Sequence, residues 1–232
     1  MAKDKQFWIK KRNKIEREEI ALREYSDSIL IVCEGEQTEP NYFKSFLTTG
    51  VKIKIIGKGK NTLTLVEDAV SEWKSCAEEG IFFEKLWCVF DKDDFPPEHY
   101  NHAFKTVKTE EKKLNEQYSK KTDRNISIKI AYSNQAFELW YLLHYDYHTS
   151  GIHRRRYGSM LTTRLKKKYK KNDLNIYDDL LILSEKTKNR QGQKFAIKNA
   201  QKLRKGNRDI HNVNPSTSVD LLVLELNEHL KS

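Results

Sequence analysis

Residues 28–43 read SILIVCEGEQTEPNYF, and this stretch decides the expected fold. Its first part, 29–33, is a continuous apolar run rich in β-branched residues, which is typical of a strand buried on both faces of a parallel sheet. Its last part is expected to begin a helix, because Pro40 fits a first helical turn, where backbone N–H groups have no partner within the helix. A strand that passes directly into a helix predicts an α/β fold.

The same unit recurs up to about residue 147. Further strands are expected at 51–56, 85–90 and 126–132, where apolar and β-branched residues are concentrated. A helical stretch follows each strand, and the last one, at 137–143, is almost entirely apolar. The predicted fold class is therefore α/β, with a mostly parallel sheet covered by helices on both faces.

Charge divides the chain unevenly. The 232 residues carry a net charge of +10, yet 151–208 alone holds 18 Lys and Arg against four acids, a local net charge of +14, which leaves −4 elsewhere. A single basic run is usually a solvated surface, but several runs in one segment favour nucleic acid, with an anionic membrane surface as the second candidate. The expected nucleic-acid contacts are Arg154, Arg155, Arg156, Lys166, Lys167, Lys168, Lys171, Arg190 and Lys194.

These patterns predict three parts. A charged helical arm is expected at 1–26, an α/β domain at 27–150, and a basic, mainly helical region at 151–232 that packs on this domain and whose last helix starts at 216 or 217. The longest apolar run has five residues, far fewer than the roughly 20 of a membrane span. The first 19 residues lack the apolar core of a secretory signal, and three scattered cysteines are typical of reduced thiols. A cytoplasmic location is expected.

Carboxylates follow two of the predicted strands. Glu34 comes directly after the first strand, with Glu39 close behind, and Asp91 and Asp93 follow the third. If these strands are neighbours, the acids share the edge where open α/β sheets bind ligands. Crowded carboxylates repel each other, and Mg²⁺ or Mn²⁺ would remove that repulsion. Either cluster alone could equally reflect a helix N-terminus or a turn.

Other polar residues interrupt or follow the apolar helix at 137–143. Glu138 is either a buried core acid with a partner or a further member of the acid site. His144 and His148 lie one helical turn apart, but no third ligand is nearby, so we interpret them as surface groups or as supports for a site.

Four blocks of sequence resemble the RloB family in the same order: 29–43, 91–94, 133–140 and 214–219. The resemblance covers nearly the whole chain from Ser28 onward and implies a Toprim-like fold. In that fold a Glu after the first strand and a DxD motif after the third form the metal site, which Glu34 and Asp91 with Asp93 match. Related nucleases add an acid in the first loop, which Glu39 matches.

The resemblance implies a prokaryotic, Mg²⁺-dependent nuclease that hydrolyses tRNA, other RNA or DNA. Family members are associated with restriction–modification loci and abortive infection of phage-infected cells, often beside an ATPase partner of AAA or ABC type. Glu34, Asp91, Asp93 and Glu138 are the expected catalytic residues. The expected metal ligands are Glu34, Glu39, Asp91 and Asp93.

Several choices remain open at this point. Glu34 is either a metal ligand or a general acid or base. One of Lys171, Lys188, Arg190 and Lys194 is expected to reach the scissile phosphate. A non-catalytic nucleic-acid-binding subunit and a phosphohydrolase of small nucleotides are the alternatives. The sequence leaves open DNA or RNA as substrate, one or two metals, a homo-oligomer, and whether the ATPase inhibits or activates.

Overall fold

The computed structural model describes residues 27–59, 62–92, 97–187, 191–205 and 213–230. The predicted arm at 1–26 lies outside the described residues, as do Asp93, Lys188 and Arg190. In the described part of the chain, no helix combines the length and apolar character that a membrane span requires.

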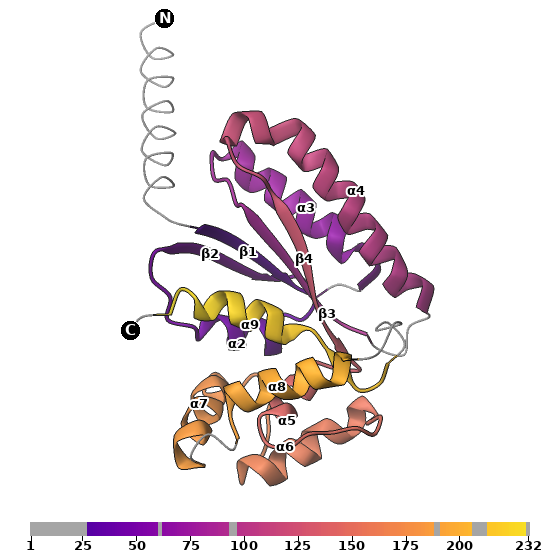
Figure 1. The fold of residues 1–232 in the computed structure, drawn as a ribbon, viewed down its shortest axis with the longest axis vertical. Helices are drawn as coiled ribbons and strands as arrows, with labels where there is room; N and C mark the ends of the chain where they lie inside the picture. The colour runs from indigo at the N-terminus through magenta and orange to yellow at the C-terminus, as the bar shows by residue number, and fades with distance from the viewer. Residues whose placement is uncertain (1–26, 60–61, 93–96, 188–190, 206–212, 231–232) are drawn as a thin grey trace, which may run out of the picture.

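A five-stranded, mostly parallel sheet forms the centre of the molecule (Figure 1). The strand order is β2-β1-β3-β4-β5, in which β1 to β4 are parallel and β5 is antiparallel to β4. The first and third strands are therefore neighbours, as the acid clusters required. The strands are β1 (Asp27–Cys33), β2 (Val51–Gly57), β3 (Lys85–Asp91), β4 (Ser127–Asn134) and β5 (Ser216–Thr217).

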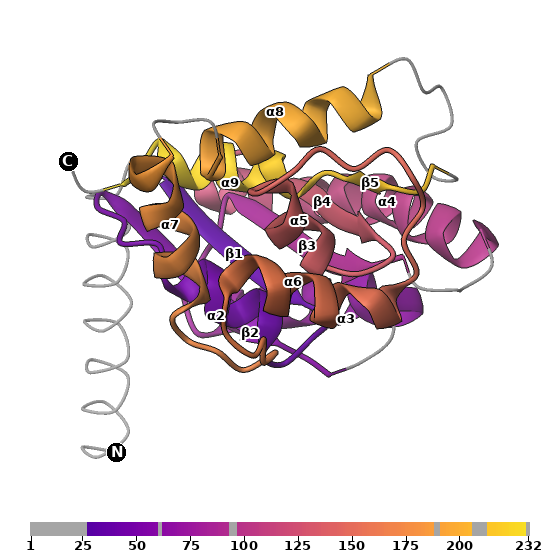
Figure 2. The same cartoon turned by 90° about the horizontal axis from the view of Figure 1, so that it is seen from below.

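Helices connect the strands and cover both faces of the sheet, which confirms the predicted fold class. Helices α5 to α8 gather beyond the carboxyl ends of the parallel strands (Figures 1 and 2). A 3₁₀ turn, η1 (Arg154–Arg156), precedes α6. The helices are α2 (Thr38–Lys44), α3 (Thr62–Glu78), α4 (Pro97–Thr122), α5 (Glu138–Leu143), α6 (Tyr157–Leu165), α7 (Ile176–Lys186), α8 (Gln193–Arg204) and α9 (Val219–Asn227).

Two apolar cores lie on opposite faces of the sheet, and β1 contributes to both. Leu30 and Val32 face the core that α3 and α4 cover. Ile29 and Ile31 face the larger core, to which α2, α5, α8 and α9 contribute. Because successive side chains of a strand point to opposite faces, burial on both faces explains why the run at 29–33 is apolar throughout.

The C-terminal segment returns to the sheet, which the sequence did not predict. The helix expected from 216 or 217 begins instead at Val219, and Ser216 and Thr217 pair with the end of β4. The hydroxyl groups of Ser133 and Thr217 lie 2.9 Å apart and satisfy each other in the interior. The larger core therefore includes residues from both sides of position 150, and the domain boundary predicted there stays a prediction.

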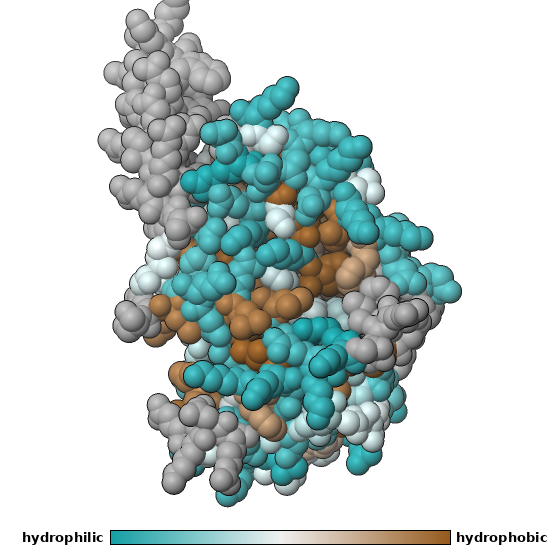
Figure 3. All heavy atoms as spheres, viewed as in Figure 1, coloured by the Kyte–Doolittle hydropathy of each residue, from teal (hydrophilic) through white to brown (hydrophobic). Residues whose placement is uncertain are grey.

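The outer surface of α9 keeps an apolar character. Leu221 and Leu224 are 46% and 38% exposed, and apolar atoms are visible over this helix, whereas polar atoms dominate over α4 (Figure 3). The buried side of α9, with Val219, Leu222 and Leu226, packs into the larger core.

Candidate functional site

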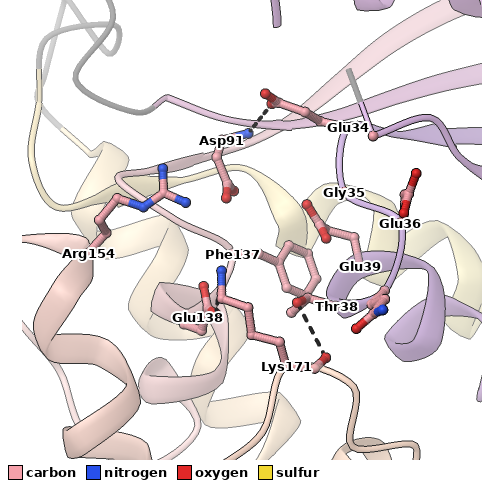
Figure 4. Close-up of a pocket in the computed structure, with 12 residues that line it drawn as sticks. Glu34, Gly35, Glu36, Thr38, Glu39, Asp91, Phe137, Glu138, Arg154 and Lys171 are labelled. Atoms are coloured by element: carbon pink, nitrogen blue, oxygen red, sulfur yellow. Dashed lines mark hydrogen bonds and ion pairs between the residues drawn. The ribbon is translucent and has the colours of Figure 1, made fainter. Parts of the chain in front are cut away.

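A cavity of about 430 Å³ opens at the carboxyl end of β1 and β3, and we call it the acid hollow (Figure 4). The β1–α2 loop, the end of β3, the start of α5 and two segments of the basic region supply its wall. Its lining residues are Glu34, Gly35, Glu36, Gln37, Thr38, Glu39, Gly59, Asp91, Phe137, Glu138, Arg154 and Lys171.

The pairing of β1 with β3 brings Glu34 to Asp91. The register sets Cys33 beside Val89, and the Glu34 backbone N–H donates to the Val89 carbonyl at 2.8 Å. The Glu34 carboxylate in turn accepts a hydrogen bond from the Asp91 backbone N–H at 3.2 Å. The Asp91 carboxylate points the other way, into the hollow toward Glu39 and Glu138 (Figure 4). Glu34 thus holds the end of β3, and Asp91 faces the cavity.

Glu39 lies in the first turn of α2 and is only 4% exposed. Burial raises the pKa of its carboxyl, its own backbone N–H lowers it, and the negative charge of Glu138 raises it again. The backbone N–H of Gly35 also lowers this pKa by hydrogen bonding to the charged form. A side chain at Gly35 would overlap the Glu39 carboxylate, so a larger residue there would displace that carboxylate.

Asp91 is the most strongly perturbed acid of the hollow. Its Oδ1 atom is buried, and burial raises the pKa of Asp91 well above its usual value. The negative charges of Glu39, Glu138 and Glu34 raise this pKa further, and the guanidinium of Arg154 opposes them. Burial and the neighbouring carboxylates therefore both disfavour the ionised form of Asp91.

Glu138 is the first residue of α5 and is 4% exposed. The Tyr169 hydroxyl donates to its Oε1 at 3.1 Å, and the Lys171 ammonium lies 3.6 Å from the same atom. Glu138 is thus a buried acid with partners, and it also lines the acid hollow, while its place in a functional site stays a prediction.

The predicted basic contacts have three different surroundings in the structure. Arg154 and Lys171 line the acid hollow, and the Arg154 backbone N–H is held by the Gln135 side chain at 2.8 Å. Lys167 is instead paired with Asp173 at 3.0 Å and with Asp179 at 2.5 Å. The exposed residues that do not line the acid hollow are Arg155, Arg156, Lys166, Lys168 and Lys194.

The donor set of the acid hollow fits a hard divalent cation. It consists of carboxylate oxygens, which Mg²⁺ and Mn²⁺ prefer, and a bound cation would relieve the repulsion that raises the pKa of Asp91 and of Glu39. Within the described ranges, no three His, Cys, Asp or Glu residues are already arranged as a metal site. Asp93, the other acid of the predicted DxD motif, falls outside those ranges.

Two groups of the site were missed by sequence reasoning. Tyr169 supports Glu138 from 31 positions away, and nothing local in a lysine-rich stretch signals that contact. The close contact of Gly35 with Glu39 does have a sequence signal, because a glycine just beyond the end of a strand often marks a close approach of another group.

Fold and site together define a mixed α/β protein whose carboxylates gather beyond two adjacent central strands. The chain belongs to the RloB-like family, since the family model described as RloB-like protein matches residues 29–226. The resemblance carried by the four sequence blocks is thus confirmed. No curated protein matches the chain, and no solved structure matches it.

Proposed function

We propose that this protein is a metal-dependent nuclease that hydrolyses phosphodiester bonds. One observation carries the proposal: buried carboxylates that repel each other line a cavity next to cations from the basic region. Burying such charges without relief costs stability, so a purely structural role does not explain them. Membership of the RloB-like family is compatible with this activity.

The carboxylates of Glu39, Asp91, Asp93 and Glu138 would hold Mg²⁺ or Mn²⁺. When bound, the cation would polarise the phosphate and lower the pKa of water. Glu34 is proposed to orient Asp91 through its backbone N–H and to accept a proton from the attacking water. Arg154 and Lys171, which reach the acid hollow from the other side, are proposed to hold the phosphate and to stabilise its developing charge.

We further propose that the substrate is tRNA, another RNA or DNA, and that the nuclease acts in anti-phage defence in the prokaryotic cytoplasm with an AAA- or ABC-type ATPase. Family membership supports this setting. Cleavage measured with and without the ATPase encoded nearby tests the partnership, and an ATPase without effect on cleavage would contradict it.

The activity is tested with purified protein, Mg²⁺ or Mn²⁺, and tRNA, single-stranded RNA or plasmid DNA as substrate. Wild type is expected to cleave at least one of these, and EDTA to abolish the cleavage. Glu34→Gln and Asp91→Asn are each expected to cleave at least about 100-fold more slowly than wild type, because each replaces a carboxylate of the acid hollow by a neutral amide. Wild-type rates in both variants would contradict the site.

The same preparations separate the alternatives. A non-catalytic binding subunit would bind nucleic acid in a salt-sensitive manner, cleave nothing, and bind equally well as Asp91→Asn. A phosphohydrolase of small nucleotides would turn over mononucleotides and would respond little when the runs at 154–156 and 166–168 are neutralised.

A further inference from the structure

A second cavity, of about 460 Å³, adjoins the acid hollow, and we call it the basic hollow. The two cavities share Glu138, Arg154 and Lys171 in their walls. A ligand that fills both would pass these three side chains. The basic hollow is lined by Ala136, Glu138, Arg154, Arg155, Gly158, Tyr169 and Lys171.

The charge reverses between the two cavities. Five carboxylates and two cations line the acid hollow, whereas three cations and one carboxylate line the basic hollow. That one carboxylate, Glu138, already has the Lys171 ammonium at 3.6 Å and the Tyr169 hydroxyl at 3.1 Å. The basic hollow is therefore suited to an anionic group that lies directly beside the acid cluster.

The wall of the basic hollow also contains a glycine and an aromatic ring, Gly158 and Tyr169. Gly158 lies in α6, and a Cβ atom added there would meet only Cδ1 of the Tyr169 ring, at 3.9 Å, an ordinary contact. The protein therefore has room for a side chain, and alanine is favoured over glycine within a helix by about 0.5–1 kcal/mol. Glycine at this position keeps a side chain out of the basic hollow, which Gly158 and the Tyr169 ring both line.

We propose that the basic hollow binds the nucleotide next to the scissile phosphodiester, and this inference rests on the proposed nuclease function. Arg155 binds the phosphate of that nucleotide, beside Arg154 and Lys171 at the scissile phosphate, and its base or ribose lies in the basic hollow against Gly158 and the Tyr169 ring. The volume suits one small ligand, so a nucleotide inside it has left its base pair. The substrate class is accordingly nucleic acid with an unpaired segment at the cleavage position.

Binding is measured in EDTA, so that affinity is read without cleavage, with a fluorescent single strand and with a duplex of the same sequence. Gly158→Leu fills the basic hollow, and Thr163→Leu adds the same side chain to an exposed position of the same helix. Gly158→Leu is expected to weaken single-strand binding about tenfold, because it blocks contact with the aromatic ring. Duplex binding is expected to change less than about twofold, and Thr163→Leu to change neither.

Two further variants keep the test decisive if Gly158→Leu unfolds. Arg155→Ala removes a cation that lines only the basic hollow, and Lys198→Ala removes an exposed cation of α8. Arg155→Ala is expected to weaken single-strand binding about tenfold and Lys198→Ala less than about twofold. Gly158→Ala is expected to fold at least as well as wild type and to show a smaller loss of affinity.

Equal losses for single strand and duplex, or losses no larger than in the two controls, would overturn the proposal. Cleavage by wild type in Mg²⁺ is scored separately. If the protein cleaves but its single-strand affinity is unchanged by the substitutions in the basic hollow, this inference alone is refuted. A protein that cleaves nothing refutes the proposed function, whatever the binding data show.

Discussion

The acid hollow and the basic hollow are neighbours, but different kinds of structure place their charges. Strand ends of the sheet position Glu34 and Asp91, so the register of β1 and β3 fixes where these carboxylates lie. The cations come from the turn η1 and from the segment after α6, which are held by side-chain contacts such as that of Gln135 with the Arg154 backbone. Backbone pairing thus places Glu34 and Asp91, and side-chain contacts between distant segments place the cations.

The largest effect is expected from Glu39→Gln. Removing this buried carboxylate should slow cleavage by about 10³-fold, or about 4 kcal/mol, because a proposed metal ligand is lost. The thermal unfolding temperature without divalent cations should rise, because Glu39 is one of the charges that raise the pKa of Asp91. Single-turnover cleavage and calorimetry measure the two effects.

Glu36→Gln is the matched control, since Glu36 is exposed and its carboxylate points away from Asp91 (Figure 4). It should alter neither cleavage nor unfolding. Equal effects of the two variants would mean that the acid hollow acts only through its total charge.

Asp220→Asn tests the contact that joins α8 to α9 and β5. Asp220 is fully buried and accepts hydrogen bonds from Arg204 at 2.5 and 2.7 Å, and Arg204 also donates to the Thr217 carbonyl in β5. Breaking this pair should lower the free energy of unfolding in urea by about 3 to 4 kcal/mol, because the guanidinium loses its charged partner. Asp178→Asn, at an exposed position, should stay within about 0.5 kcal/mol of wild type. A similar loss of unfolding free energy in both variants would show that the Arg204–Asp220 pair does not stabilise the fold.

Acid pH should weaken the contact between the two regions through His144. This side chain is 1% exposed, contacts the Trp140 carbonyl, and accepts a hydrogen bond from Gly192 at its own carbonyl. Burial lowers the pKa of His144 to about 4. Between pH 6.5 and 4 the unfolded chain binds a proton that the folded chain does not, so stability falls as pH falls, by at most about 3 kcal/mol.

Urea unfolding at a series of pH values measures this loss. His144→Gln should remove that part of the pH dependence, whereas His153→Gln, at an exposed position, should keep it. Identical pH dependence in wild type and His144→Gln would show that the buried imidazole does not contribute.

The smallest effect is expected from the lysine run. Replacing Lys166 and Lys168 by Ala should weaken nucleic-acid binding about tenfold and reduce the slope of log affinity against log salt by about two, because each exposed lysine can neutralise one phosphate. Lys167→Ala should lose less affinity, since Asp173 and Asp179 already bind its ammonium. A salt titration of nucleic-acid binding measures both effects. Equal slopes for all three lysines would contradict the prediction that Lys167 contributes less than Lys166 and Lys168.

Local patterns were enough to predict the sheet and the edge where the acids meet. Glu34 and Asp91 stand directly at the ends of apolar strands, and the parallel arrangement brings them together. The burial of His144 was not predicted. Its interpretation as a surface group was wrong, because its side chain is 1% exposed and its backbone carbonyl accepts a hydrogen bond from Gly192, directly before α8. The partners of Glu138 and the pairing of β5 also depend on contacts between residues far apart in the chain, which periodicity does not encode.

The pairing of β5 bears on the order in which the molecule is built. Asp91 stands beside Ser133 in the sheet, and Ser133 stands beside Thr217, 84 positions further along the chain. A contact of that separation closes a long loop and tends to form late in folding. A nascent chain on the ribosome therefore lacks the strand beside Ser133 until residue 217 has left the exit tunnel, so the sheet is expected to be completed at this edge later than the strands that carry Glu34 and Asp91.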